Sequence, residues 1–191
     1  AHDTYYCGGL VGELTGNSKI INCNVNDELS DNADTQGPTK VDTYVGGIVG
    51  HLNVTLEQNY GILNSSAGIK FYGGASYPNE AYCGLVGYLE QGCLTNCLTS
   101  MEIVGNVREF DYISFTDKTD KQQLHNVFYC NSNTEHNKLN ALNLLSDQYA
   151  ILNQYIIDFP TKSVGFNNWH DVGGGFAQVD RHDVHDFDLT Q

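Results

Sequence analysis

Basic residues are scarce in this sequence: 9 Lys or Arg stand against 23 Asp or Glu among 191 residues, so the formal net charge is -14. Such a polyanion repels phosphate backbones and anionic lipid headgroups, which makes nucleic acids and membrane surfaces unfavourable partners. No apolar run approaches the roughly 18 residues that a membrane-spanning helix needs. We therefore expect a soluble chain without a membrane span.

Catalytic motifs are also missing. The sequence has no G-x-S-x-G turn, and its glycine clusters lack the lysine of a phosphate-binding loop. Arg108 and Arg181 are the only arginines, and they lie far apart in the sequence. We interpret the isolated His51 and His125 as surface or core residues. These observations predict a protein that is not an enzyme, and a polysaccharide-cleaving enzyme is the least favoured alternative.

Only 3 prolines are present, against 20 glycines. Glycine supplies the positive-φ corners of turns, so this balance indicates many short strands rather than long helices. Three similar segments support that interpretation, because each has a Gly-Leu/Ile-Val-Gly core and ends at an asparagine. The cores start at Gly9, Gly47 and Gly84, which are 38 and then 37 residues apart. A fourth, degraded copy is expected at residues 127–131. Repeats of this length are typical of stacked architectures.

The three copies resemble the GLUG-motif family, which is named for a Gly-Leu-any-Gly core that often continues to Asn-Cys. The resemblance covers residues 5 to about 105. It implies an extracellular or cell-surface, secreted, adhesin-like protein in which the repeats form a β-solenoid, and it implies no catalytic residues. The second copy departs from the pattern, with Ser65 in place of the final cysteine.

The expected fold is therefore mainly β: a β-solenoid of GLUG-like repeats with a small C-terminal α+β extension. Residues 1–105 hold the three copies. Residues 106–191 hold the degraded fourth repeat, a helical segment between about 137 and 158 and closing strands between 164 and 179. Leucines that recur every three or four residues predict the helical segment. We expect both regions to pack as one unit.

The six cysteines include no C-x-x-C pair, which favours disulfides in an oxidising compartment over a zinc site. Copies one and three carry a cysteine before the core and another after the asparagine, whereas copy two carries neither. Joint presence and joint absence predict Cys7–Cys23 and Cys83–Cys97, which leaves Cys93–Cys130. A ladder of stacked free cysteines is the alternative.

Two acidic stretches are candidate sites for calcium. The first contains Asp27, Glu28, Asp31 and Asp34, and the second contains Asp180, His182, Asp186 and Asp188. Oxygen ligands of this kind suit a hard divalent cation, so we expect any bound metal to be structural Ca²⁺. An ordinary acidic surface loop and a solvated C-terminal tail are the alternatives.

Aromatic residues and sequons suggest contact with glycans. Sugar-stacking candidates are Tyr5, Tyr6, Tyr72 and Tyr77, whereas Trp169 fits core packing better. Asn53 and Asn64 begin N-x-S/T sequons and are candidate glycosylation sites in a eukaryotic secretory pathway.

The main functional prediction is a non-catalytic extracellular structural or adhesive module that self-associates into a filament or surface assembly through the open ends of its repeats. The alternative is an adhesin domain that binds a glycan or another cell-surface partner.

Overall fold

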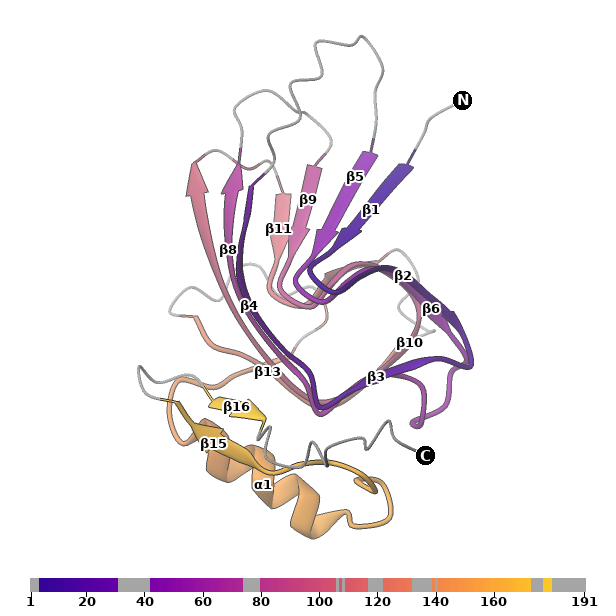
Figure 1. The fold of residues 1–191 in the computed structure, drawn as a ribbon, viewed down its shortest axis with the longest axis vertical. Coiled ribbons are helices and arrows are strands. Elements are labelled where there is room, and N and C mark those ends of the chain that lie inside the picture. The colour runs from indigo at the N-terminus through magenta and orange to yellow at the C-terminus, as the bar shows by residue number, and fades with distance from the viewer. Residues whose placement is uncertain are drawn as a thin grey trace, which may run out of the picture.

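The computed structural model describes residues 4–30, 42–73, 80–105, 107, 109–116, 122–131, 139, 141–172 and 177–179. Most of these residues lie in β-strands, and a single short helix follows near the C-terminal end (Figure 1). The predictions of a mainly β chain and of a small C-terminal helix are confirmed.

The strands are arranged in four successive layers, which we call rungs. Rung one comprises β1 (Thr4–Gly8), β2 (Val11–Gly16), β3 (Lys19–Ile21) and β4 (Asn24–Ser30). Rung two comprises β5 (Asp42–Gly46), β6 (Val49–Val54), β7 (Gly61–Leu63) and β8 (Ser66–Gly73). Rung three comprises β9 (Glu80–Cys83) and the long β10 (Val86–Gly105). Rung four comprises β11 (Glu109–Asp111), β12 (Ser114–Phe115) and β13 (Gln122–Tyr129).

Corresponding strands of neighbouring rungs pair in parallel. The first strands form a sheet in the order β1-β5-β9-β11, and the remaining nine strands of the rungs form a ten-stranded sheet together with β14 (Leu142–Asn143). Within that sheet, β10 is long enough to pair with β6, β7 and β8 of rung two along its length. Seen along the stacking direction, the strands trace a nearly closed loop, with α1 outside it (Figure 1).

Glycine is required where each rung turns from its first strand into its second. A Cβ at Gly9 would collide with the carbonyl oxygen of Gly47, and a Cβ at Gly47 would collide with that of Gly84. At Gly84 the obstacle is the carbonyl oxygen of Tyr112. The recurring Gly core of the sequence therefore marks the position where the backbones of adjacent rungs approach most closely.

The main core fills the inside of the loop. It contains equivalent residues from successive rungs, such as Leu52 and Leu89, which are paired in register and completely buried. Phe71 packs against Tyr82 with ring centroids 5.1 Å apart. Stacking therefore buries apolar faces that a single rung could not bury alone.

The fourth rung begins earlier than the sequence suggested. Its Tyr112-Ile113 segment takes the place of Gly84-Leu85, because Asp111 is paired with Cys83 and Ser114 with Val86. In β13 it is Asn126, not Asn131, that occupies the place of Asn96. The copy expected at residues 127–131 therefore falls at the end of rung four, whose first strand begins at Glu109. The start was missed because rung four has no Gly core in the sequence.

The C-terminal part contains β14 (Leu142–Asn143), α1 (Gln148–Asp158), β15 (Trp169–Asp171) and β16 (Ala177–Val179). The predicted helical segment is thus too long at its N-terminal side, since Leu142 belongs to a strand paired with β13. The closing hairpin is present as the antiparallel pair β15-β16. Leu152 of α1 and Trp169 of β15 join Leu98 and Phe128 in a second apolar cluster, which attaches this part to the rungs.

No helix in the described part of the chain has the length and apolar character needed to cross a membrane.

Candidate functional site

A cluster of aromatic, acidic and imidazole side chains lies outside the corner where each rung turns from its first strand into its second. We call this corner the elbow. Two columns of register-paired residues meet there. The first column is Tyr6, Tyr44 and Ala81, and the second is Glu13, His51, Tyr88 and Phe115. Contacts between the columns are diagonal: Tyr6 stacks on His51 with ring centroids 4.4 Å apart, and Tyr44 lies 5.1 Å from Tyr88.

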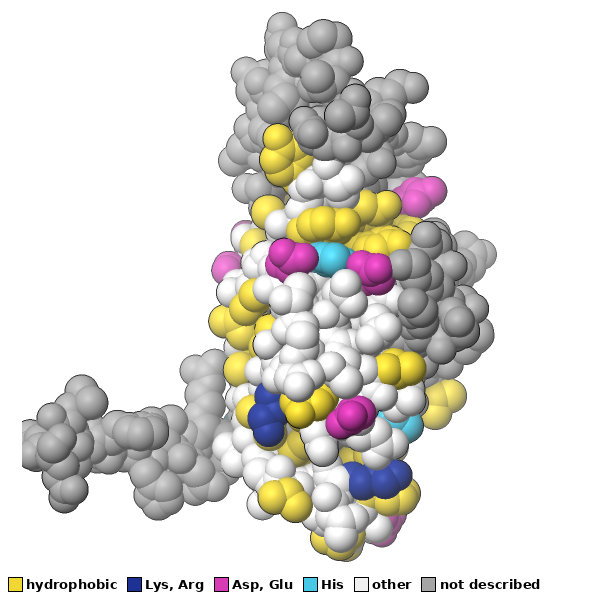
Figure 2. Space-filling model, turned by 90° about the vertical axis from the view of Figure 1, so that its right-hand side faces the viewer, with side chains coloured by type: hydrophobic (Ala, Val, Ile, Leu, Met, Phe, Trp, Pro, Cys, Tyr) yellow, Lys and Arg dark blue, Asp and Glu magenta, His cyan; other side chains and the backbone are white. Residues whose placement is uncertain are grey.

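On the molecular surface, a histidine lies between two acidic side chains, with a band of hydrophobic side chains directly beside them (Figure 2). The three side chains differ in exposure: that of Glu13 is 58% exposed, that of Glu90 31%, and that of His51 9%. The elbow therefore presents carboxylates and tyrosines to solvent above a buried imidazole.

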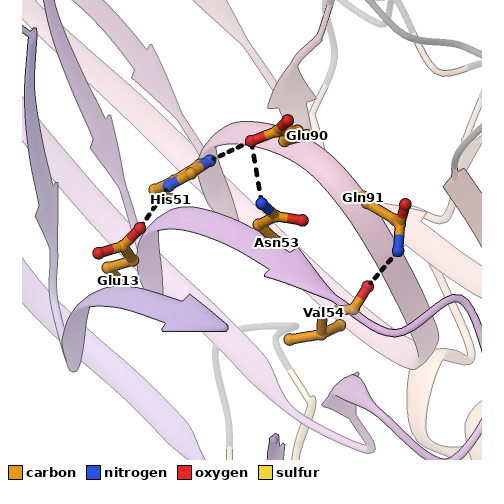
Figure 3. Close-up of polar contacts among 6 residues, drawn as sticks. All are labelled: Glu13, His51, Asn53, Val54, Glu90 and Gln91. Carbon is orange, nitrogen blue, oxygen red and sulfur yellow. Dashed lines mark hydrogen bonds and ion pairs between the residues drawn. The ribbon is translucent and has the colours of Figure 1, made fainter. Parts of the chain in front are cut away.

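His51 holds both carboxylates (Figure 3). Its Nδ1 lies 3.0 Å from Oε1 of Glu13, and its Nε2 lies 3.3 Å from Oε2 of Glu90. A neutral imidazole has only one N–H, so only the imidazolium offers a proton to both carboxylates. Glu90 reaches this position because the register of β10 against β6 is interrupted between Leu89 and Gln91.

Asn53 fixes the second carboxylate, since its Nδ2 donates to Oε2 of Glu90 at 3.1 Å (Figure 3). Burial, followed by the charges of Glu90 and Glu13, raises the pKa of Tyr6. Two carboxylates against a single imidazole leave the elbow with a net negative charge. The prediction that His51 is only a surface or core residue missed this grouping.

The predicted sugar-stacking tyrosines fall on different surfaces. Tyr6 lies at the elbow, whereas Tyr5 is 58% exposed on the same strand. Tyr72 is half-buried on β8, where its hydroxyl donates to Oε2 of Glu28 at 3.2 Å. Tyr77 lies outside the described residues. Trp169 is 3% exposed and packs in the second apolar cluster, as its core interpretation predicted.

A groove of about 550 Å³ lies over β4, β8 and β10, next to the β15-β16 hairpin. Its floor carries register-paired Glu28, Lys70 and Glu102, and Nζ of Lys70 lies 3.4 Å from Oε1 of Glu102. Val172 and Gln178 contribute from the C-terminal part. Asp27 also lines the groove, so three carboxylates stand against one lysine there.

The predicted calcium ligands are only partly visible. Asp27 and Glu28 are exposed on β4, and Oδ1 of Asp27 accepts the amide of Glu28 at 2.8 Å. Among the residues that the structure describes, no three His, Cys, Asp or Glu side chains converge as metal ligands. The remaining candidates, Asp31, Asp34, Asp180, His182, Asp186 and Asp188, lie outside the described residues. Calcium binding stays a prediction.

All six cysteines are free thiols in the structure, so the three predicted disulfides are not formed. The argument from joint presence compared positions that are not equivalent, because Cys7 aligns through Val45 with Tyr82 rather than with Cys83. Cys83 packs with Ala81 and Phe115 at the elbow, whereas Cys97 belongs to the main core. Cys93 is paired with Gln123, at the opposite end of β13 from Cys130.

The position after the asparagine favours a small hydrogen-bond donor rather than a disulfide in the first three rungs. Sγ of Cys23 donates to the carbonyl of Ile21, and Sγ of Cys97 donates to that of Thr95. Ser65 occupies the same position in rung two, and its hydroxyl donates to the carbonyl of Leu63 at 2.7 Å. Serine therefore replaces cysteine without loss of this bond.

Neither sequon is freely exposed. Asn64 is completely buried, and its amide donates to Oδ1 of Asn22 and to the carbonyl of Asn167. The glycosylation prediction at Asn64 is therefore wrong for the folded chain, since no glycan fits there. Asn53 is half-buried and binds Glu90 at the elbow.

A ladder of asparagines was not predicted from the sequence. Asn64 donates to Asn22, Asn96 donates to Asn64 and Asn126 donates to Asn96, over distances of 2.6–2.7 Å. All four have positive φ, between 46° and 57°, as tight bends require. Recurrence of Asn at the end of each copy was the signal for this ladder.

Comparison with known families identifies the first rung. Residues 3–30 match the family model described as the GLUG motif. The chain carries a GLUG motif. This segment contains the first Gly core and ends at β4, so the GLUG motif corresponds to one rung of the structure. No curated protein and no solved structure gives a significant match to the chain.

Proposed function

We propose that this chain is a non-catalytic extracellular module in which GLUG rungs form a β-solenoid, and that the module associates with further copies of itself through its first rung. Parallel pairing in register over four rungs supports the solenoid. An extracellular location follows from the family resemblance and is part of the same proposal.

The observation that carries self-association is the open end of rung one. In the described part of the chain, β1, β2, β3 and β4 each pair with rung two only, so their outer edges have no neighbouring strand. Unpaired edges of this kind are templates for another strand. The edge of β1 carries no charged side chain between Thr4 and Gly8, so nothing there repels an approaching strand.

Apolar side chains are also left partly exposed at this end. Leu14 is half-buried, whereas its register partner Leu52 is completely buried. The same contrast holds between Val25 and Ala67. Leu10 is 50% exposed at the corner of the rung. A copy stacked on rung one would bury this surface, and contact between unlike ends would continue into a filament.

Light scattering of size-fractionated protein tests the proposal across a concentration series. We expect species larger than the monomer that grow with concentration. Leu10→Lys places a charge at the open end and should shift the population to monomer. Ile157→Lys is the matched control, because Ile157 is 69% exposed on α1 and lies away from rung one. A monomer at every concentration, or equal effects of the two variants, contradicts the proposal.

A further inference from the structure

The elbow combines three features that together select a class of ligand: a net negative charge, tyrosine rings that are partly exposed and carboxylates that are already oriented. The first feature excludes acidic glycans. Glu13 and Glu90 contribute two negative charges, more than a single imidazole can offset, and the whole chain carries -14. A uronic acid or a sulfated sugar would be repelled at this surface.

The tyrosines provide a surface for stacking. Tyr6, Tyr44 and Tyr88 come from three rungs and lie within 6.4 Å of one another, measured between ring centroids. Each is half-buried, so part of each ring remains in contact with solvent. An aromatic face attracts both the C–H face of a sugar ring and a cation. Three such rings across the rungs form a strip rather than a closed pocket.

The carboxylates are held in place before any ligand arrives. His51 contacts both of them, and Asn53 donates to Glu90. Each carboxylate can accept several hydrogen bonds, so the bond from His51 leaves acceptor capacity on Glu13, whose side chain is 58% exposed. Carboxylates fixed by such supporting contacts bind a cationic donor without a further ordering cost.

From this arrangement we infer that the elbow binds a glycan with free amino groups, with a sugar ring stacked on the tyrosines and an ammonium group on Glu13. Charge complementarity favours this class over neutral sugars, because a neutral ring would use the tyrosines but gain nothing from the net charge. The inference does not depend on self-association, since the elbow lies on the side of the stack.

Calorimetry with a glucosamine hexamer tests the inference, with the N-acetylglucosamine hexamer as the neutral counterpart. We expect saturable binding of the amino form and affinity at least about tenfold lower for the acetylated form, because acetylation removes the charge. A lysine hexapeptide is the third probe and carries the same charge without a sugar ring. Equal affinity for the acetylated hexamer, equal affinity for the peptide, or no binding of the amino hexamer overturns the inference.

Two variants locate the site. Glu13→Gln keeps the shape of the side chain and should weaken binding about tenfold, and Tyr6→Ala should weaken it by a similar factor. Their matched controls are Glu28→Gln, which removes the same charge from β4, and Tyr5→Ala, which removes an exposed tyrosine from the same strand. Circular dichroism confirms that each variant is folded. If the control variants weaken binding as much as the elbow variants do, the site does not lie at the elbow.

Discussion

Asn64 donates a hydrogen bond from Nδ2 to Oδ1 of Asn22 at 2.7 Å, and the two residues belong to neighbouring rungs. The same side chain accepts from Nδ2 of Asn96 on its other side and from Nε1 of Trp169 in the C-terminal part. One buried amide thus connects three rungs and the segment that covers them.

Asn64→Ala should lower the free energy of unfolding by about 3 kcal/mol, because it leaves the buried donors of Asn96 and Trp169 without an acceptor. Chemical denaturation monitored by tryptophan fluorescence measures the loss. Asn64→Gly separates the loss of the amide hydrogen bonds from the strain of the positive φ. Glycine tolerates the φ of 46° but also lacks the amide. Asn26→Ala, at an exposed asparagine on β4, is the control and should change little. A similar stability for the Asn64 and Asn26 variants contradicts the role of the ladder.

Gly47→Ala should destabilise the chain by about 3 kcal/mol, because its Cβ would collide with the backbone of Gly84 in the next rung. Gly12→Ala, in the core of the preceding repeat, is a matched control: the nearest atom to its Cβ would be the carbonyl oxygen of Tyr6 at 3.5 Å, an ordinary contact. Thermal unfolding of the two variants provides the measurement. Equal melting temperatures would show that the rungs can separate to accommodate a methyl group at Gly47.

Cys97 should make stability depend on pH in the alkaline range. Burial raises the pKa of its thiol to about 12, from an ordinary value of 9.0. The folded chain therefore holds this proton more tightly than the unfolded chain, so the contribution to stability is complete below pH 9 and is lost as the pH rises towards 12. We expect unfolding free energy to fall less steeply above pH 9 in Cys97→Ser than in the unmodified chain.

That serine variant should retain its fold, because Ser65 makes the equivalent bond in rung two. Identical pH dependence in both proteins contradicts the assignment to Cys97. Thiol labelling provides a second readout: the exposed Cys7 should react with a disulfide reagent in the folded state, whereas Cys97 should react only after unfolding.

His51 and Glu13 should be energetically coupled. His51→Ala removes the imidazole that separates two carboxylates, so the variant is expected to be less stable. Combined with His51→Ala, Glu13→Gln should recover part of the lost stability, because it removes one of the two carboxylates. On its own, Glu13→Gln removes a favourable contact with His51. A double-mutant cycle measures the coupling, which we expect at about 1 kcal/mol. Additive effects of the two changes contradict an interaction between these side chains.

The repeat period could be determined from the sequence, because a rung must place glycine wherever the next backbone passes closely. Gly9, Gly47 and Gly84 mark those places, and the asparagines mark the bends that need positive φ. These are local requirements of the backbone. They are visible in a single sequence, and they predicted the mainly β class and the first three rungs correctly.

The elbow was within reach of the same reasoning. The offset of 38 residues that aligns Gly9 with Gly47 also aligns Glu13 with His51. Applying it to polar positions would have brought the two together. The offset of 37 residues that aligns Gly47 with Gly84 also aligns Asn53 with Glu90, its hydrogen-bond partner. The contact between Glu90 and His51 does not follow from that offset, because it depends on an irregularity in β10.

The rest depended on tertiary structure. Cysteine pairing could not be inferred from the presence and absence of cysteines in the repeats. Side chains of adjacent residues point to opposite faces of a strand, so a difference of one residue in register places Cys83 outside the main core. Likewise, Asn24 binds the backbone of Val179 through its side-chain amide, across 155 residues. Local sequence determines the shape of a rung. Contacts over such long separations form only after the rungs have stacked, because stacking decides which surfaces remain for the C-terminal part to cover.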